Sequence, residues 1–146
     1  MKDVFQRRGT YALIIDTSTT QTVTFGAQAE RKLSHDTYAY IGSALHSNGF
    51  RRVQRHHDVA QGSNDTTHWH IDYLLHDATL TKALFAPGQA IECRTAQYLD
   101  GERIAQIGCT DCDCDTHLVG QKPASITKQL RDIGFTASHE FKSSTT

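Results

Sequence analysis

Five basic or titratable side chains are concentrated in one seven-residue segment. They are Arg51, Arg52, Arg55, His56 and His57. On a helix, residues three and four positions apart are neighbours, so Arg52, Arg55 and His56 would share one side. Basic side chains gathered on one face are typical of proteins that contact nucleic-acid phosphates. The alternative interpretation is an ordinary solvated helix face.

The same segment has an apolar side that would attach it to a core. At about 100° per residue, we expect a helix over residues 50–60 whose buried side is made by four residues. They are Phe50, Val53, His57 and Ala60. The predicted helix therefore anchors through one side and presents its arginines on another.

A cysteine-rich segment is the second place where the residue types could do chemistry. Four zinc-compatible ligands form the pattern C-x2-C-x-C-x2-H, namely Cys109, Cys112, Cys114 and His117. The C-x2-C pair is a common zinc spacing, whereas C-x-C-x2-H is not a standard half of a zinc finger. Cys93 could replace Cys109 as a ligand. The segment is therefore either a structural zinc site, as in a zinc-stabilised interaction domain, or a compact loop that binds no metal.

The overall charge is nearly neutral, with 15 Lys and Arg against 16 Asp and Glu and a formal net charge of −1. This value argues mildly against nucleic-acid binding, unless the cationic side chains are gathered on one face. No apolar run is long enough to cross a membrane, and the first residues lack a signal peptide. We expect a cytoplasmic protein with reduced thiols and no membrane partner.

The elements that must position these residues are those of one α+β domain. We expect strands over residues 11–15 and 22–26, paired as a hairpin, and further strands over 38–42, 70–75 and 80–85. We expect helices over residues 50–60, 89–99 and 126–133, and a loop over 108–120. The domain should span residues 1–140, followed by a flexible tail over 141–146.

The order of these segments resembles the GIY-YIG nuclease domain. Gly9-Thr10-Tyr11 opens the first strand, Tyr40-Ile41-Gly42 closes the third, the arginine-rich helix follows, and Glu92 lies in a later helix. Thr10 departs from the family pattern, in which isoleucine is usual. The resemblance implies a GIY-YIG-type α+β domain with a small central antiparallel β-sheet flanked by α-helices.

Two longer motifs resemble a small, stand-alone and mostly archaeal branch of that superfamily. They are His68-Trp69-His70-Ile71-Asp72-Tyr73-Leu74 and Asp111-Cys112-Asp113-Cys114-Asp115-Thr116-His117-Leu118. All these motifs together extend over residues 9–118, most of the chain.

The resemblance implies an endonuclease that hydrolyses DNA with the help of Mg²⁺ or Mn²⁺. Either Tyr40 or Tyr11 would activate the water, and we favour Tyr40 as the general base with Tyr11 positioning the water. Arg52 would contact the scissile phosphate, because Arg52-Val53-Gln54-Arg55-His56 fits the R-x-x-R-H spacing of the family. Glu92 would hold the divalent metal, a role suited to a carboxylate oxygen.

Other residues would assist by the same resemblance. His56 is the first choice for an assisting histidine, and the substrate contacts would be Arg51, Arg55, His68 and His70. The alternative function is a non-catalytic nucleic-acid-binding module that retains the GIY-YIG fold. With one site per chain, cutting both strands would favour a homodimer.

Overall fold

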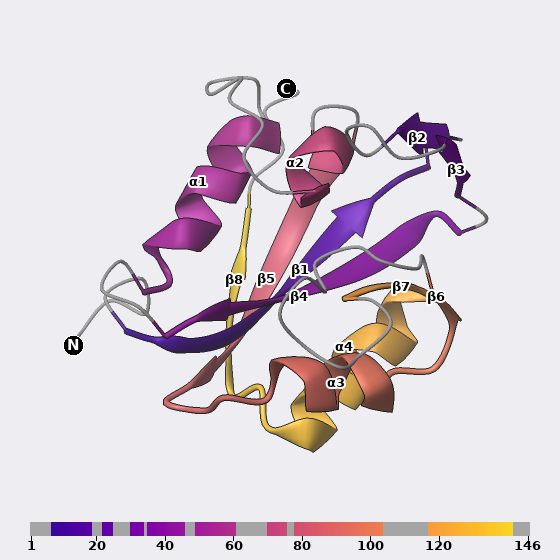
Figure 1. Ribbon diagram of the computed structural model, residues 1–146. Coiled ribbons are helices and arrows are strands. Elements are labelled where there is room, and N and C mark those ends of the chain that lie inside the picture. Colours follow the sequence, from indigo (N-terminus) through magenta and orange to yellow (C-terminus); the bar gives the residue numbers. More distant parts are fainter. Residues whose placement is uncertain are drawn as a thin grey trace.

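The centre of the molecule is a six-stranded antiparallel sheet in the order β6-β7-β4-β1-β5-β8 (Figure 1). The strands are β1 (Gly9–Asp16), β4 (Thr37–Ala44), β5 (Thr79–Pro87), β6 (Glu102–Arg103), β7 (Leu118–Gly120) and β8 (Ala137–Glu140). A second sheet pairs β2 (Thr22–Thr24) with β3 (Glu30–Lys32). This computed structural model describes residues 7–18, 22–24, 30–33, 35–45, 49–60, 70–75, 78–103 and 117–141.

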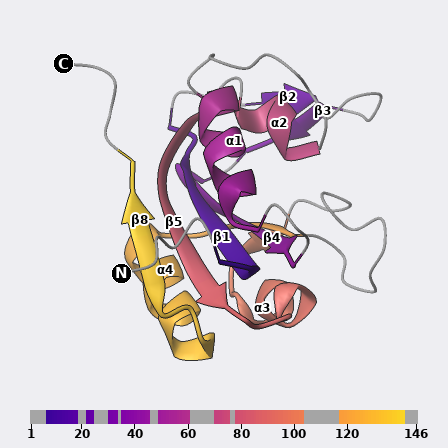
Figure 2. The ribbon, with the colours of Figure 1, turned by 90° about the vertical axis from the view of Figure 1, so that its left-hand side faces the viewer.

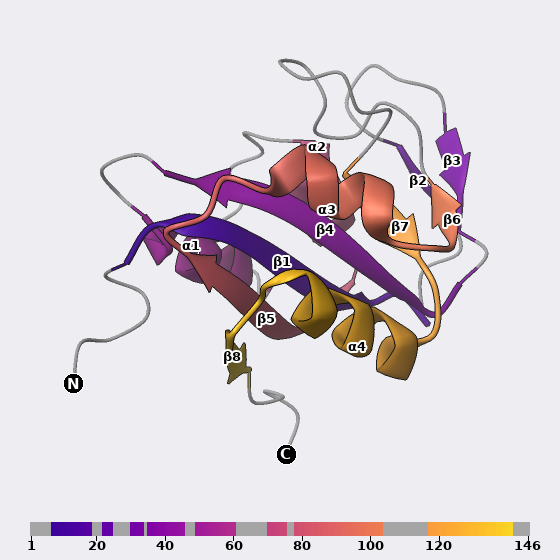
Figure 3. The same ribbon diagram turned by 90° about the horizontal axis from the view of Figure 1, so that it is seen from below.

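Helices cover both faces of the large sheet. They are α1 (Arg51–Ala60), α2 (His70–Leu75), α3 (Glu92–Tyr98) and α4 (Pro123–Ile133). Helices α1 and α2 lie on one face, and α3 and α4 lie side by side on the other (Figures 2 and 3). The prediction of an α+β domain with a central antiparallel sheet flanked by helices is confirmed. Within the described residues, none of the helices has the length and apolar character needed to cross a membrane.

The two covered faces explain the continuous apolar run at the start of the chain. Successive side chains of a strand point to opposite faces. Tyr11, Leu13 and Ile15 accordingly enter the core beneath α1 and α2, whereas Ala12 and Ile14 enter the core beneath α3 and α4. A strand buried on both faces has no polar alternation, which is why this segment reads as an unbroken apolar run.

The predicted hairpin between residues 11–15 and 22–26 is wrong. Strand β1 is central and pairs with β4 on one side and with β5 on the other, and β2 pairs with β3. Of the three residues of β2, only Val23 is buried. Strand β2 is short and buries one side chain, so it offers little apolar surface for pairing with β1. The longer strands β4 and β5 pair with β1 instead.

The predicted strand over residues 70–75 is also wrong, because these residues form helix α2. Ile71, Leu74 and Leu75 are all fully buried. Positions separated by three and four residues lie on one side of a helix, whereas a strand would bury alternate positions. The apolar residue types favoured a strand, whereas the spacing of the buried positions is that of a helix.

The other predicted elements are present with small shifts at their ends. Strands β4 and β5 and helices α1, α3 and α4 contain or overlap the expected ranges. Strand β7 ends the segment that was predicted to be a loop, and β6 and β8 were not predicted. Strand β8 is a short edge strand in which Ser138, His139 and Glu140 are exposed, so it carries no apolar signal.

Candidate active site

Tyr11 is the centre of a cluster of polar side chains at the boundary between the sheet and α1. It lies on β1 opposite Gly42 of β4, and only 2% of its surface is exposed. A Cβ atom at position 42 would overlap the ring and hydroxyl of Tyr11. The glycine of the Tyr40-Ile41-Gly42 segment therefore leaves the space that the Tyr11 phenol occupies.

His56 lies against this phenol, and the Tyr11 hydroxyl is 2.9 Å from His56 Nε2. The prediction that His56 shares an outward side of the helix with Arg55 is wrong, because His56 is 1% exposed and half-buried Arg55 is not part of that contact. Buried positions Val53, His56 and Val59 define the inner side of α1. The imidazole is thus buried against the Tyr11 hydroxyl.

Arg52 lies one helical turn before His56 and closes the cluster from the other side. Its Nη1 donates to the carbonyl oxygen of Ser43 at 2.6 Å, and its side chain also hydrogen-bonds Tyr11. A guanidinium can only donate, so the Tyr11 oxygen accepts from Arg52, and the tautomer of His56 decides whether Tyr11 donates to Nε2 or accepts from it. Ser43, which sequence reasoning did not single out, fixes the guanidinium through its backbone.

The protonation state of Tyr11 follows from its surroundings. Burial raises the pKa of Tyr11 well above its ordinary value of 10.0, and the charges of Tyr40 and Glu92 raise it further. The Arg52 charge and hydrogen bond act in the opposite direction without cancelling these effects. Tyr11 is therefore a neutral hydrogen-bonding group at neutral pH.

Tyr40 completes the aromatic part of the cluster. It lies on β4, is 7% exposed, and its ring meets the His56 ring edge-on with centroids 6.3 Å apart. The Tyr11 and His56 ring centroids are 5.8 Å apart. Three rings from β1, β4 and α1 are thus packed together, and Tyr40 retains some access to solvent.

Glu92 is brought to this region by an unexpected residue, Thr10. The buried Thr10 hydroxyl donates to the carbonyl oxygen of Gln89 at 2.8 Å and accepts from the Ile91 amide at 3.0 Å. These two bonds attach the segment before α3 to the start of β1, next to Tyr11. An apolar side chain such as that of isoleucine could make neither bond.

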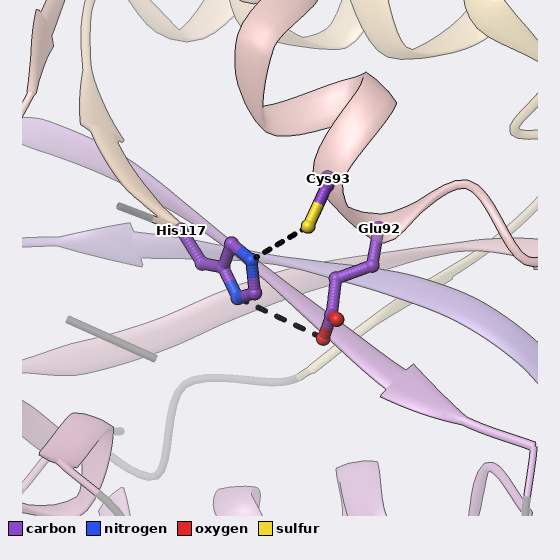
Figure 4. A group of neighbouring side chains, drawn as sticks. All are labelled: Glu92, Cys93 and His117. Atoms are coloured by element: carbon purple, nitrogen blue, oxygen red, sulfur yellow. Dashed lines mark hydrogen bonds and ion pairs between the residues drawn. The ribbon is translucent and has the colours of Figure 1, made fainter. Parts of the chain in front are cut away.

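Glu92 also belongs to a group of three metal-ligating side chains with Cys93 and His117 (Figure 4). Glu92 Oε2 lies 3.7 Å from His117 Nδ1, and Cys93 Sγ lies 3.7 Å from His117 Nε2. Taking one donor atom from each residue, all three atoms lie within 4.8 Å of one another. The arrangement could hold one metal ion.

The state of His117 suits such a role. It is 1% exposed, and burial lowers its pKa to about 4, although a carboxylate lies nearby. The imidazole is therefore neutral at neutral pH, as a metal ligand must be. The sequence indicated part of this group, because Cys93 is a possible zinc ligand together with His117. No pattern in the sequence indicated that Glu92 lies beside these two residues.

The remaining predicted site residues fall into two groups. Arg51 is exposed and Arg55 half-buried on α1, and His70 begins α2. His68 and the three cysteines of the zinc motif lie outside the described residues; the cysteines are Cys109, Cys112 and Cys114. The predicted zinc set is therefore represented here by His117 alone.

The chain matches a model of a known protein family. Residues 10–138 match the model described as "Domain of unknown function DUF123". The chain belongs to this family. The matched range contains every residue of the Tyr11 cluster and all three residues of the Glu92, Cys93 and His117 group. No curated protein and no solved structure matches the chain.

Proposed function

We propose that this DUF123 protein is a metal-dependent endonuclease of the GIY-YIG type that hydrolyses DNA phosphodiester bonds. One observation carries the proposal: the buried Tyr11 phenol of β1 lies 2.9 Å from His56 Nε2 of α1, with the Tyr40 ring of β4 against the same imidazole and Arg52 of α1 fixed beside it by the Ser43 carbonyl. Perturbed titratable groups gathered from separate elements are typical of active sites. Packing alone requires neither the arginine nor the glutamate beside two tyrosines.

The two tyrosines have different surroundings and, we propose, different roles. The raised pKa of Tyr11 keeps its proton in place, so its hydroxyl positions the attacking water and relays hydrogen bonding between Arg52 and His56. Tyr40, which is slightly more accessible, takes the proton from the water. A phenol is a weak base near neutral pH unless cations stabilise the phenolate, and the substrate complex supplies such cations.

Arg52 is proposed to stabilise the charge that grows on the scissile phosphate. Its bond to the Ser43 carbonyl fixes the guanidinium and uses one of its five N–H donors. The planar shape of a guanidinium matches two oxygens of a phosphate, and fixed donors stabilise a transition state without reorganisation. Arg55, one turn later on α1, is proposed to bind the flanking phosphodiester backbone.

Glu92 is proposed to hold the divalent metal that the reaction requires. A bound divalent cation neutralises negative charge on a phosphate and on the departing oxygen. The carboxylate suits this task because it is 29% exposed, anchored by α3, and close enough to Tyr11 to influence its pKa.

The test is cleavage of single-stranded, duplex and branched DNA with Mg²⁺ or Mn²⁺. Glu92→Ala and Arg52→Ala should each lower the cleavage rate by about 100-fold or more, as expected for loss of a group that stabilises the transition state. The matched controls are Glu140→Ala and Arg131→Ala, which remove exposed side chains of β8 and α4 and should cleave at the normal rate.

Equal trace activity in the wild type and Glu92→Ala on all substrates would reject catalysis at this site. Salt-sensitive DNA binding that is weakened by Arg55→Ala, with no metal-dependent product, would instead support the non-catalytic binding module.

A further inference from the structure

Glu92, Cys93 and His117 offer three different donor atoms in one place. Glu92 and Cys93 are consecutive residues of the first turn of α3, and His117 immediately precedes β7. Their side chains converge from these two segments (Figure 4). We propose that they bind one divalent transition-metal ion of intermediate softness, such as Zn²⁺ or Co²⁺, in preference to Mg²⁺. This inference deepens the proposed function, because it identifies the metal that Glu92 holds. The metal site itself does not depend on the proposed function, and only a catalytic role of the bound metal rests on it.

The chemistry of the donors selects the metal. Mg²⁺ is bound through oxygen atoms, usually a few carboxylates together with water and substrate phosphate. A set of one carboxylate oxygen, one imidazole nitrogen and one thiolate sulfur instead suits Zn²⁺ and related ions. If Glu92 alone held Mg²⁺, the adjacent thiol and imidazole would contribute nothing to its binding.

The separations of the donors are compatible with one ion. In a tetrahedral site with metal–ligand distances of about 2.0–2.3 Å, neighbouring donor atoms lie roughly 3.3–3.8 Å apart. The two contacts to His117 are 3.7 Å each, and the full set lies within 4.8 Å. Because the contacts involve different ring nitrogens, binding requires a rotation of the imidazole or a shift of the acidic and thiol side chains by about 1 Å.

Among the residues that the structure describes, no fourth side chain closes the site around these three ligands. The carbonyl oxygen of His117 accepts a hydrogen bond from the Ile41 amide at 2.9 Å, which holds the backbone of His117 beside the central strands. His117 is buried, whereas Glu92 and Cys93 are half-buried. Three protein ligands with a fourth position open to water or substrate are the arrangement of catalytic zinc sites, and structural sites are closed by a fourth protein ligand.

The test measures metal binding alone, with Co²⁺ as the probe and no DNA present. A thiolate bound to Co²⁺ produces a ligand-to-metal charge-transfer absorption band that carboxylate and imidazole ligands lack. The wild-type protein, kept reduced, should show this band at stoichiometric Co²⁺, and an excess of Mg²⁺ should not remove it. Cys93→Ser should abolish the band, and His117→Ala should weaken Co²⁺ binding by about 10-fold or more.

A triple variant separates this site from the other thiols of the chain. Cys109→Ser, Cys112→Ser and Cys114→Ser together should leave the band intact, since the proposed site uses none of them. The proposal is overturned if the band survives Cys93→Ser, if the triple variant loses it, or if Mg²⁺ displaces the Co²⁺. Circular dichroism confirms that each variant is folded, so that loss of the band reports on a ligand.

The outcome is independent of the outcome for the nuclease. Co²⁺ binding that depends on Cys93, in a protein that cleaves no DNA, would support the metal site and reject the proposed function. Cleavage supported by Mg²⁺ and unaffected by Cys93→Ser, without a Co²⁺ band, would support the function and reject the mixed-ligand site.

Discussion

At the scale of single residues, the unusual group is the Tyr11 phenol, which is buried between a guanidinium and an imidazole. Burial and the neighbouring negative groups keep its pKa well above 10.0 in the folded protein. The unfolded chain loses the same proton near the ordinary value of about 10. Between these two pKa values the folded state holds more protons than the unfolded state, so the free energy of unfolding must fall as the pH rises above 10.

We therefore expect the Tyr11 hydroxyl to lose its proton at a higher pH than an ordinary tyrosine does. In an ultraviolet titration of the five tyrosines, Tyr11→Phe should remove part of the absorbance change well above pH 10 and leave the earlier part intact. The free energy of unfolding of this variant should also decline less steeply above pH 10. Tyr98→Phe, which changes a tyrosine that is 47% exposed, is the control. A normal titration of Tyr11 would show that its hydroxyl is not buried among these groups.

Thr10 leads to a second residue-scale prediction. Thr10→Val keeps the shape of the side chain but removes both hydrogen bonds to the segment before α3. Leaving these partly buried backbone groups without their bonds should cost about 1–3 kcal/mol of stability, measured by urea unfolding. Because Glu92 follows directly, cleavage or Co²⁺ affinity should fall as well. Thr136→Val, at an exposed position after α4, should have little effect, and an equal loss in both variants would contradict the role of Thr10.

At the scale of elements, residues 70–75 form a helix, and this assignment predicts the opposite effect of two substitutions from the one that a strand would give. Leu74 is fully buried in α2, whereas Tyr73 is only half-buried. In a strand that buries Ile71 and Leu75, alternation would bury Tyr73 and expose Leu74. Leu74→Ala should therefore cost about 2–5 kcal/mol of stability through the cavity it leaves. Tyr73→Ala should cost clearly less in the same denaturation experiment, and the opposite order would favour a strand.

The elements also explain which parts of the site could be predicted. Tyr11, Tyr40, Arg52 and Glu92 were singled out because their order along the chain resembles that of the GIY-YIG nuclease domain, and their catalytic roles stay a prediction. The roles of His56 and Thr10 were not recognisable. Helical spacing fixes which residues share a side, but the side that faces the sheet depends on how the helix docks. The hydroxyl of Thr10 acquires its role only from a segment about 80 positions later in the chain.

At the scale of the whole molecule, one chain offers one Tyr11 cluster. A single site cuts one strand at a time, unless two chains act together. On supercoiled plasmid DNA we expect nicked circles to form before linear molecules at low protein concentration, as followed by gel electrophoresis. Linear product without a nicked intermediate, together with a dimer in sedimentation experiments, would show that two chains cooperate. Glu92→Ala is the control for contaminating nuclease.

The near-neutral net charge is also a property of the whole molecule. With a net charge of −1, the proposed binding of DNA would depend on a local basic surface rather than on the overall charge. The exposed and half-buried arginines of α1 provide that surface beside the Tyr11 cluster. Binding should therefore weaken with increasing salt in proportion to the few phosphates contacted.

The sequence by itself determined the α+β class, most of the helices and strands, and the positions of the candidate catalytic residues. These properties depend on local periodicity and on short motifs, which are visible along the chain. Tertiary structure alone decided the pairing of β1 with β4 and β5, the inward orientation of His56, and the union of Glu92 and Cys93 with His117. Each of these depends on which distant segments pack together, and packing is set by the burial of whole faces rather than by the spacing of neighbouring residues.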